Sequence, residues 1–268
     1  MNALVRGFYQ TSGKEGESFF HSVLFLSESE ESWEKARARC ADLPRGWYEL
    51  CRLPIVDRIS FIRDFWLGRL PYHPSFWKVL NDFFAKLDDV GVVLSQASAN
   101  SPWNAEMVYS LKENRSFFRG PPPCKEEDLE ELKAAANIML PRDYLSFLHI
   151  HDGFGKLTEL GLLKARQAVR AKEKLMNALI SNERALMNEG KVVDPSSLIP
   201  FFESFGTDSY QCFFADWYPG NEMGNVYLSG IDYTISYCTD PKEWSDQLAF
   251  PSFLDWLAFY IEGNSQEQ

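Results

Sequence analysis

The chain has 268 residues, of which 45% are hydrophobic and 15% aromatic, so it is long and apolar enough to bury a core and is not a disordered protein. Its net charge of −11 disfavours binding to the phosphates of nucleic acids. The five cysteines are widely spaced without a Cys-x-x-Cys pair, which argues against a disulfide scaffold or a zinc finger. We recognise no signal peptide and no apolar run of about 20 residues, and we therefore expect a cytoplasmic protein that binds no membrane.

The first 120 residues mix predicted strands and helices. Residues 22–27 predict a short buried strand, and residues 27–43 predict a helix with Ser27 or Ser29 as its cap. The proline-interrupted segment 47–74 predicts short helices, and residues 75–87 predict an amphipathic helix. Residues 90–96 and 105–112 predict two strands. We expect an α/β N-terminal extension or subdomain, and its sequence identifies no family.

Three consecutive prolines, Pro121 to Pro123, follow this region. They exclude a helix or a central strand and predict a stiff connector between two domains, residues 1–120 and 121–268. Beyond them, residues 126–137, 142–152 and 162–187 predict helices, residues 209–215, 225–230 and 231–238 predict strands, and residues 251–261 predict a closing helix. This order predicts an α+β fold with a mainly antiparallel sheet and helices packed on it.

His149 and His151 lie near the end of the predicted helix 142–152 and raise the question of a metal site. On a helix, residues two apart point about 200° away from each other, so these imidazoles do not chelate one ion. A His-x-His pair shares a face only on a strand. We therefore expect surface or boundary histidines and no metal ion, with Asp152 bonding the turn locally.

The same segment resembles the opening signature of the SUKH superfamily, which groups fungal cell-wall synthesis regulators with bacterial toxin-immunity proteins. The resemblance rests on four pairs of residues: Leu140-Pro141, Asp143-Tyr144, Phe147-Leu148 and Asp152-Gly153. Later pieces follow in order: Ile199-Pro200-Phe201, a strand that ends at Asp216, the sequence NVYLSG, and Ser252-Phe253. The resemblance covers about residues 124–262, although segment 156–193 is longer and more helical than is usual in the family.

The resemblance implies an α+β domain that binds a protein partner and is not an enzyme. The leading hypothesis is an immunity protein that neutralises a basic toxin domain, since an acidic surface attracts and selects a basic partner. The candidate contact residues are acids in predicted loops around the sheet: Asp152, Glu203, Asp208, Asp216 and Glu222. For each of them, a plain surface acid is the simpler explanation. The second hypothesis is an intracellular scaffold or regulator, and a homo-oligomer through the apolar closing helix also stays open.

Known catalytic motifs are missing from the sequence. Gly-x-Ser-x-Gly, the phosphate-binding loop, the dinucleotide-binding fingerprint and His-Glu-x-x-His do not occur, so we expect no catalytic residues and no cofactor. An enzyme with a cleft between the two halves is the third hypothesis. The stretch 216–225 offers oxygen ligands, but its spacing does not match an EF-hand loop and a polar turn explains it. The bases of segment 164–174 form either a solvated helix face or a docking face for an acidic partner.

Overall fold

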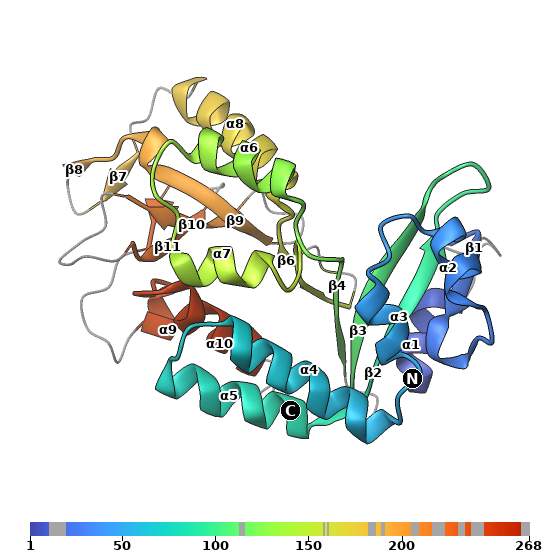
Figure 1. Cartoon of the computed structure of the whole chain (residues 1–268). Coiled ribbons are helices and arrows are strands. Elements are labelled where there is room, and N and C mark those ends of the chain that lie inside the picture. The colour runs from blue at the N-terminus through green and yellow to red at the C-terminus, as the bar shows by residue number, and fades with distance from the viewer. Residues whose placement is uncertain are drawn as a thin grey trace. The chain divides into compact units, whose positions relative to one another are not determined.

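Figure 1 shows the protein as a computed structural model of the 268-residue chain. The structure describes residues 1–10, 20–112, 116–157, 159, 161–181, 186–188, 191–204, 209–215, 223–229, 234–236 and 244–263. Its contacts divide the chain into two compact units. The first unit comprises Met1–Gly68, Asn81–Pro123 and Phe154–Thr158. The second unit comprises Arg69–Leu80, Cys124–Gly153 and Glu159–Gln268.

The first unit is built on an antiparallel sheet whose described strands follow the order β1-β2-β3-β4-β5. These strands are β1 (Ser22–Phe25), β2 (Leu87–Gln96), β3 (Trp103–Leu111), β4 (Phe117–Gly120) and β5 (Gly155–Lys156). Its helices are α1 (Ala3–Gln10), the short η1 (Leu26–Glu28), α2 (Trp33–Arg39), α3 (Arg45–Leu50) and α4 (Ile55–Arg69). Helix α5 (Pro74–Ala85) begins in the second unit and ends in the first. The N-terminal region thus contains both helices and strands, as predicted.

A group of aromatic side chains forms the core of the first unit. Trp66 of α4 is fully buried, and its indole N–H donates a hydrogen bond of 3.1 Å to the hydroxyl of Tyr109 on β3. Phe154 stacks on Phe118 of β4 with ring centres 5.3 Å apart. Buried aromatic rings contribute more than their area alone because their edges and faces attract each other. Residues from α4, β3 and β4 and the returning Phe154 therefore share one core.

The second unit contains a larger sheet whose described strands follow the order β6-β9-β10-β11-β12-β7-β8. Its strands are β6 (Gly161–Leu162), β7 (Met187–Asn188), β8 (Lys191–Val192), β9 (Leu198–Ser204), β10 (Ser209–Phe214), β11 (Asn225–Ser229) and β12 (Thr234–Ile235). All of these pairings are antiparallel except that of β12 with β7. The predicted α+β fold with a mainly antiparallel sheet is confirmed.

Helices pack on this second sheet. They are α6 (Glu126–Ala136), α7 (Arg142–Leu148), α8 (Ala165–Ser181), the short η3 (Pro195–Ser197), α9 (Trp244–Gln247) and α10 (Phe253–Glu262). Helix α8 packs against α6 and β9, and α7 packs against α10 (Figure 1). None of the described helices combines the length and apolar character that a bilayer crossing requires.

Several helices are shorter than the sequence predicts, among them those predicted over residues 27–43 and 162–187. Residues 27–43 form η1 and α2, because the Ser29 hydroxyl accepts a hydrogen bond from the Glu31 N–H at 3.0 Å and bends the chain before the helix starts. The long helix predicted over 162–187 is α8, Ala165–Ser181. Leu162 instead pairs with Phe202 in the sheet, and Met187 pairs with Val192. Strand pairing therefore takes residues that their spacing alone assigned to a helix.

The contacts of the second unit predict how a fragment that begins at the proposed domain boundary, residue 121, behaves. A fragment 121–268 lacks Arg69–Leu80, which the contacts assign to the second unit and which includes the buried Phe76 and Leu80. We expect this fragment to aggregate or to unfold at lower denaturant than the full chain, measured by urea unfolding followed by circular dichroism. A fragment that unfolds in one transition at the stability of the full chain would show that residues 121–268 are a self-sufficient domain.

Candidate functional site

The residues of the family-like motif form an aromatic cluster in the second unit. The ring of Tyr144, on α7, lies 4.9 Å from that of Phe213 on β10 and 5.3 Å from that of Phe253 on α10. Phe201 of β9 stacks on Phe213 at 4.2 Å, and Phe147 lies 5.5 Å from Phe253. All five side chains are at most 1% exposed. The motif thus joins α7, the sheet and α10 through one apolar contact.

Pro200 explains how Phe201 enters this cluster. The pairing of β9 with β10 shifts register here, since Gln211 faces Phe202 while Cys212 faces Pro200. Phe201 is therefore the extra residue of a β-bulge, and proline, which has no N–H to donate, is tolerated at bulges. The carbonyl of Phe201 accepts a hydrogen bond of 2.8 Å from the Leu163 N–H.

Asp143 fastens α7 to the start of α10. One of its oxygens accepts a hydrogen bond of 3.1 Å from the Leu254 N–H, and the other accepts one of 2.9 Å from the Tyr144 N–H. Ser252 adds a helix cap, because its hydroxyl accepts a hydrogen bond from the Asp255 N–H at 3.1 Å. A carboxylate at a helix N-terminus also interacts favourably with the helix dipole.

Asp152 and Gly153 form the turn that leads towards α8. An oxygen of Asp152 accepts a hydrogen bond of 2.7 Å from the N–H of Ala165, the first residue of α8. Gly153 has φ +102°, and a Cβ there would lie 3.0 Å from the Leu162 carbonyl oxygen. Only glycine adopts this conformation without strain. Burial raises the pKa of the Asp152 carboxyl, while the Ala165 N–H and Lys164 oppose that rise.

The two histidines lie in different environments. Helix α7 ends at Leu148, earlier than the predicted residue 152, because the N–H groups of Ile150 and His151 both donate to the Phe147 carbonyl in a tight turn. His149 is exposed, whereas His151 is buried and its ring lies 6.4 Å from that of Phe147. Across the described residues, no three His, Cys, Asp or Glu side chains lie together as a metal site requires.

A buried amide network connects the strands to the approach of α10. Asn225, which is fully buried, accepts a hydrogen bond of 2.7 Å from Gln211 and donates one of 3.0 Å to the Ser252 carbonyl. Gln211 also donates to the Leu248 carbonyl at 2.9 Å. The sequence points to Asn225 only as one of the oxygen ligands of the stretch 216–225, and it does not single out Gln211. The signal was an amide in each of two otherwise apolar strands, which buries a polar group that needs partners.

The basic residues of α8 bind α6. The Arg166 Nε lies 2.7 Å from a carboxylate oxygen of Asp128, and the Lys172 ammonium donates to the carbonyls of Ala135 and Ala136 at 2.9 and 3.0 Å. Cations at a helix C-terminus satisfy its unpaired carbonyls and complement its dipole. These two residues thus bind within the unit, which leaves fewer of the bases of segment 164–174 for contacts with an acidic partner.

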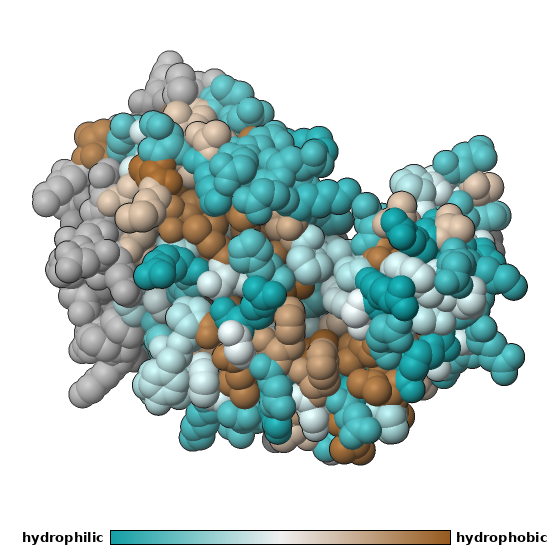
Figure 2. Space-filling model, viewed as in Figure 1, coloured by the Kyte–Doolittle hydropathy of each residue, from teal (hydrophilic) through white to brown (hydrophobic). Residues whose placement is uncertain are grey.

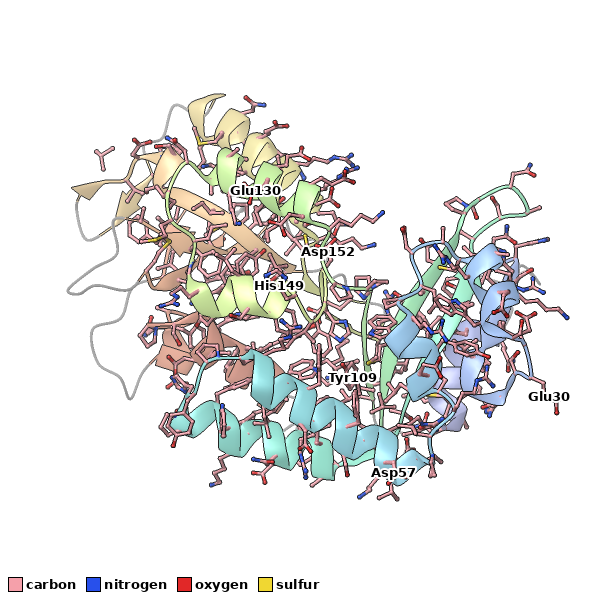
Figure 3. The ribbon with its side chains drawn as sticks, in the orientation of Figure 1. Glu30, Asp57, Tyr109, Glu130, His149 and Asp152 are labelled. Carbon is pink, nitrogen blue, oxygen red and sulfur yellow. The ribbon has the colours of Figure 1, made fainter. Side chains whose placement is uncertain are left out.

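Of the five acidic candidates for partner binding, Asp208, Asp216 and Glu222 lie outside the described residues. Figure 3 labels Asp152 on the segment that follows α7, where its carboxylate is occupied by the start of α8. Glu203 is half-buried on β9, and one of its oxygens lies 3.5 Å from the hydroxyl of Tyr210. Asp152 therefore has a local role in the fold, and Glu203 is available on the surface.

The comparison with protein families gives one match. The family model described as SMI1 / KNR4 family (SUKH-1) matches residues 123–258. The match begins at the last of the three prolines and ends within α10, so it contains the aromatic cluster and both aspartate caps. The resemblance predicted from the sequence is confirmed. A search of the curated proteins gave no match to the chain.

Tyr144→Phe tests the aromatic cluster. The Tyr144 hydroxyl is buried and has no hydrogen-bond partner among the described residues. Its removal should leave the free energy of unfolding unchanged or raise it by up to about 1 kcal/mol. The matched change Phe147→Ala, which leaves a cavity, should lower it by about 3–5 kcal/mol. Urea unfolding measures both, and a loss of more than about 1 kcal/mol in Tyr144→Phe would reveal a partner for the hydroxyl.

The pKa of Asp152 predicts a pH effect on stability. Because burial raises this pKa above 3.8, the folded chain retains the proton in a pH range where the unfolded chain has lost it. The stability of the wild type relative to Asp152→Asn should therefore rise as the pH falls through that range, and should level off at neutral pH. Urea unfolding of both proteins between neutral pH and about pH 4 measures the difference. Relative destabilisation of the wild type on acidification would contradict the assignment.

Proposed function

The chain belongs to the SMI1 / KNR4 family (SUKH-1), and on that premise we propose that it is a protein-binding module for a basic partner. At the family level, membership supports a non-catalytic binding or immunity-type module. The choice of a basic partner rests on one observation, which is how the charge is distributed along the chain.

The whole net charge of the chain lies in its last 75 residues. Residues 194–268 contain 12 acidic residues and one basic residue, Lys242, and so carry the full net charge of −11. Residues 1–193 contain 26 acidic and 26 basic residues and are neutral. The acidic segment begins just before β9 and includes the rest of the second unit's chain. A field of one sign confined to one part of a protein attracts partners of the opposite sign and speeds their association.

Several described acids of this segment are available at the surface. Asp194, Asp246 and Glu262 are exposed, and Glu203 is half-buried. Asp255 differs from them, because it bonds Ser252 and lies 3.3 Å from the His73 ring nitrogen. Backbone and side-chain hydrogen bonds from Ser196 lower the pKa of Asp194, which keeps this carboxylate charged at neutral pH.

For the specific role, we propose neutralisation of a basic toxin domain. A toxin that acts on nucleic acid needs a basic surface to hold phosphates. An acidic protein that covers this surface competes with the nucleic acid for the same contacts. Most of the acidic segment, residues 194–258, lies within the part of the chain that the family model matches and for which the family implies an immunity or regulatory role, and this overlap supports the proposal.

A scaffold is the second candidate, and a separate observation favours it. The first unit exposes apolar side chains around the start of α4: Leu53 is 39% exposed, Ile55 46%, Val56 73% and Phe61 57%. Figure 2 shows hydrophobic surface over this part of α4, at lower right. Exposed apolar surface of this kind is typical of contacts that do not depend on charge.

A pull-down of the tagged full-length chain at low and near-molar salt tests the proposed function. We expect a basic protein that is captured at low salt and released at high salt, because salt screens exposed charges. The triple variant Glu203→Gln, Asp246→Asn, Glu262→Gln should weaken that binding by about ten-fold or more. The matched variant Glu30→Gln, Asp57→Asn, Asp82→Asn, which removes three acids from the neutral part of the chain, should change it by less than about two-fold.

The outcomes separate the candidates. A complex that resists salt and is unaffected by the acidic triple variant would favour the scaffold over the basic partner. Equal losses in the two triple variants would show that total charge, and not the acidic segment, determines binding.

A further inference from the structure

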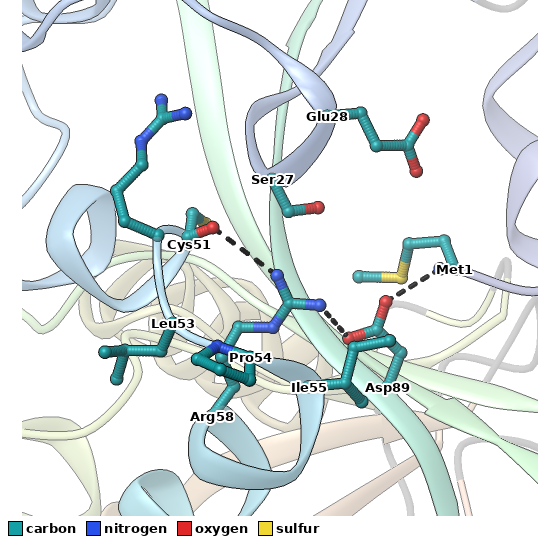
Figure 4. A pocket seen from close by; sticks show the side chains of 10 residues that line it. Met1, Ser27, Glu28, Cys51, Leu53, Pro54, Ile55, Arg58 and Asp89 are labelled. Carbon is teal, nitrogen blue, oxygen red and sulfur yellow. Dashed lines mark hydrogen bonds and ion pairs between the residues drawn. The ribbon is translucent and has the colours of Figure 1, made fainter.

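A cavity of about 590 Å³ lies wholly within the first unit. This volume is within the range of roughly 300–1,000 Å³ that is usual for small-molecule sites. Arg58, Asp89 and Cys51 line one part of it, and Ser27 and Glu28 line another (Figure 4). The neutral N-terminal half of the chain thus contains a space that the family match, which begins at residue 123, does not include.

A buried guanidinium contributes donors to this cavity. The side chain of Arg58 is 6% exposed, and its Nη2 lies 2.7 Å from a carboxylate oxygen of Asp89. Its Nη1 reaches the Cys51 carbonyl at 3.5 Å. Its Nε is buried and has no hydrogen-bond partner among the described residues. An unpaired buried donor is unfavourable, and an acceptor brought by a ligand would relieve that cost.

The start of α4 lies at the same cavity. Pro54 and Ile55, at the start of this 15-residue helix, both line it. The first N–H groups of a helix have no partner within the helix, and they attract anions together with the helix dipole. The helix start and the unpaired Arg58 Nε therefore both favour a negatively charged group.

The acidic groups of the cavity are already neutralised. Asp89 is paired with Arg58 and with the amino group of Met1, and Glu28 is paired with Arg6. Burial raises the pKa of the Cys51 thiol to about 11, so the thiol is uncharged at neutral pH. These paired carboxylates still disfavour a dianion such as phosphate more than a monoanion, since each added charge meets their repulsion.

The rim of the cavity is apolar. Leu53 and Ile55 line it and are 39% and 46% exposed, and Val56 beside them is 73% exposed. Apolar side chains left in water at the mouth of a cavity gain free energy when a ligand covers them. The ligand should therefore have an apolar part next to its charged group.

We propose that this cavity binds a monocarboxylate that carries an apolar chain. The carboxylate would accept hydrogen bonds from the Arg58 guanidinium and from the start of α4, and the apolar chain would cover Leu53 and Ile55. Two kinds of ligand carry a carboxylate next to an apolar chain: a free aliphatic acid and the C-terminus of a peptide that ends in an apolar residue. The proposal does not depend on the partner of the acidic segment.

Equilibrium dialysis of the full-length chain tests the proposal with two ligands and their neutral amides. Octanoate represents a free acid, and acetyl-leucyl-leucine represents a peptide C-terminus. We expect at least one of them to bind saturably with a Kd of about 1 mM or tighter, within the limit for ligands of this size. The corresponding amide should bind about ten-fold more weakly, because a charged hydrogen bond is lost. The acid that binds more tightly shows whether the cavity prefers a free aliphatic acid or a peptide C-terminus.

Two variants locate the site. Ile55→Glu places a carboxylate at the cavity rim, at a helix start where an acid is tolerated, and should weaken binding by about ten-fold or more. Phe61→Glu adds the same charge on the same helix, about 9 Å farther along its axis, and should change binding by less than about two-fold. Arg58→Gln removes the guanidinium while Asp89 keeps the amino group of Met1 as its partner, and it should abolish the preference for the acid over its amide.

Three results would overturn the proposal. They are the absence of saturable binding for both acids, equal binding of an acid and its amide, and equal effects of Ile55→Glu and Phe61→Glu. Ile55→Glu lies on the exposed rim, so it decides the location even if Arg58→Gln fails to fold.

Discussion

The second unit depends on the insertion of Phe201 into the aromatic cluster. Phe201 reaches Tyr144, Phe213 and Phe253 because a β-bulge beside Pro200 lets its residue leave the regular ladder. That contact places α7 and α10 on the sheet. The caps at Asp143 and Asp152 then set where α10 and α8 begin. Because apolar packing fixes these helices, the exposed polar residues of the unit are not needed for its core and are available for contacts at the surface.

This arrangement explains how the second unit tolerates its acidity. Ion pairs such as that of Arg166 with Asp128 balance the charge between α6 and α8. The acids after residue 193 have a single basic residue in their own segment, and their mutual repulsion lowers stability. A basic partner would remove the repulsion as it binds, so the same charges that weaken the isolated unit would strengthen the complex.

The sequence predicts the fold class and the family well but not every element boundary. The apolar spacing around Tyr144 and Phe147 is a local signal, and the structure has a helix there with both side chains buried. The order of the motif pieces can also be read from the sequence, and the family match confirms it. The two ends of α8 are not set by local signals, because Leu162 pairs with Phe202 and Met187 pairs with Thr234, 40 and 47 residues farther along the chain. The Asn225 network and the Arg58 cavity likewise join residues that are distant in sequence, so no short motif indicates them. Whether the acidic candidates contact a partner remains a prediction.

The route of the chain between the two units has a consequence for synthesis. Strand β4 is followed by the prolines and α6, and its neighbour β5 arrives only with Gly155–Lys156. On a ribosome, the first sheet therefore keeps an open edge at β4 until more than 30 further residues have emerged. An open strand edge readily pairs with another chain, so the nascent chain is exposed to misassociation during this interval. Strand β4 has only four residues, which limits that risk, since a short edge offers few hydrogen bonds to a second chain.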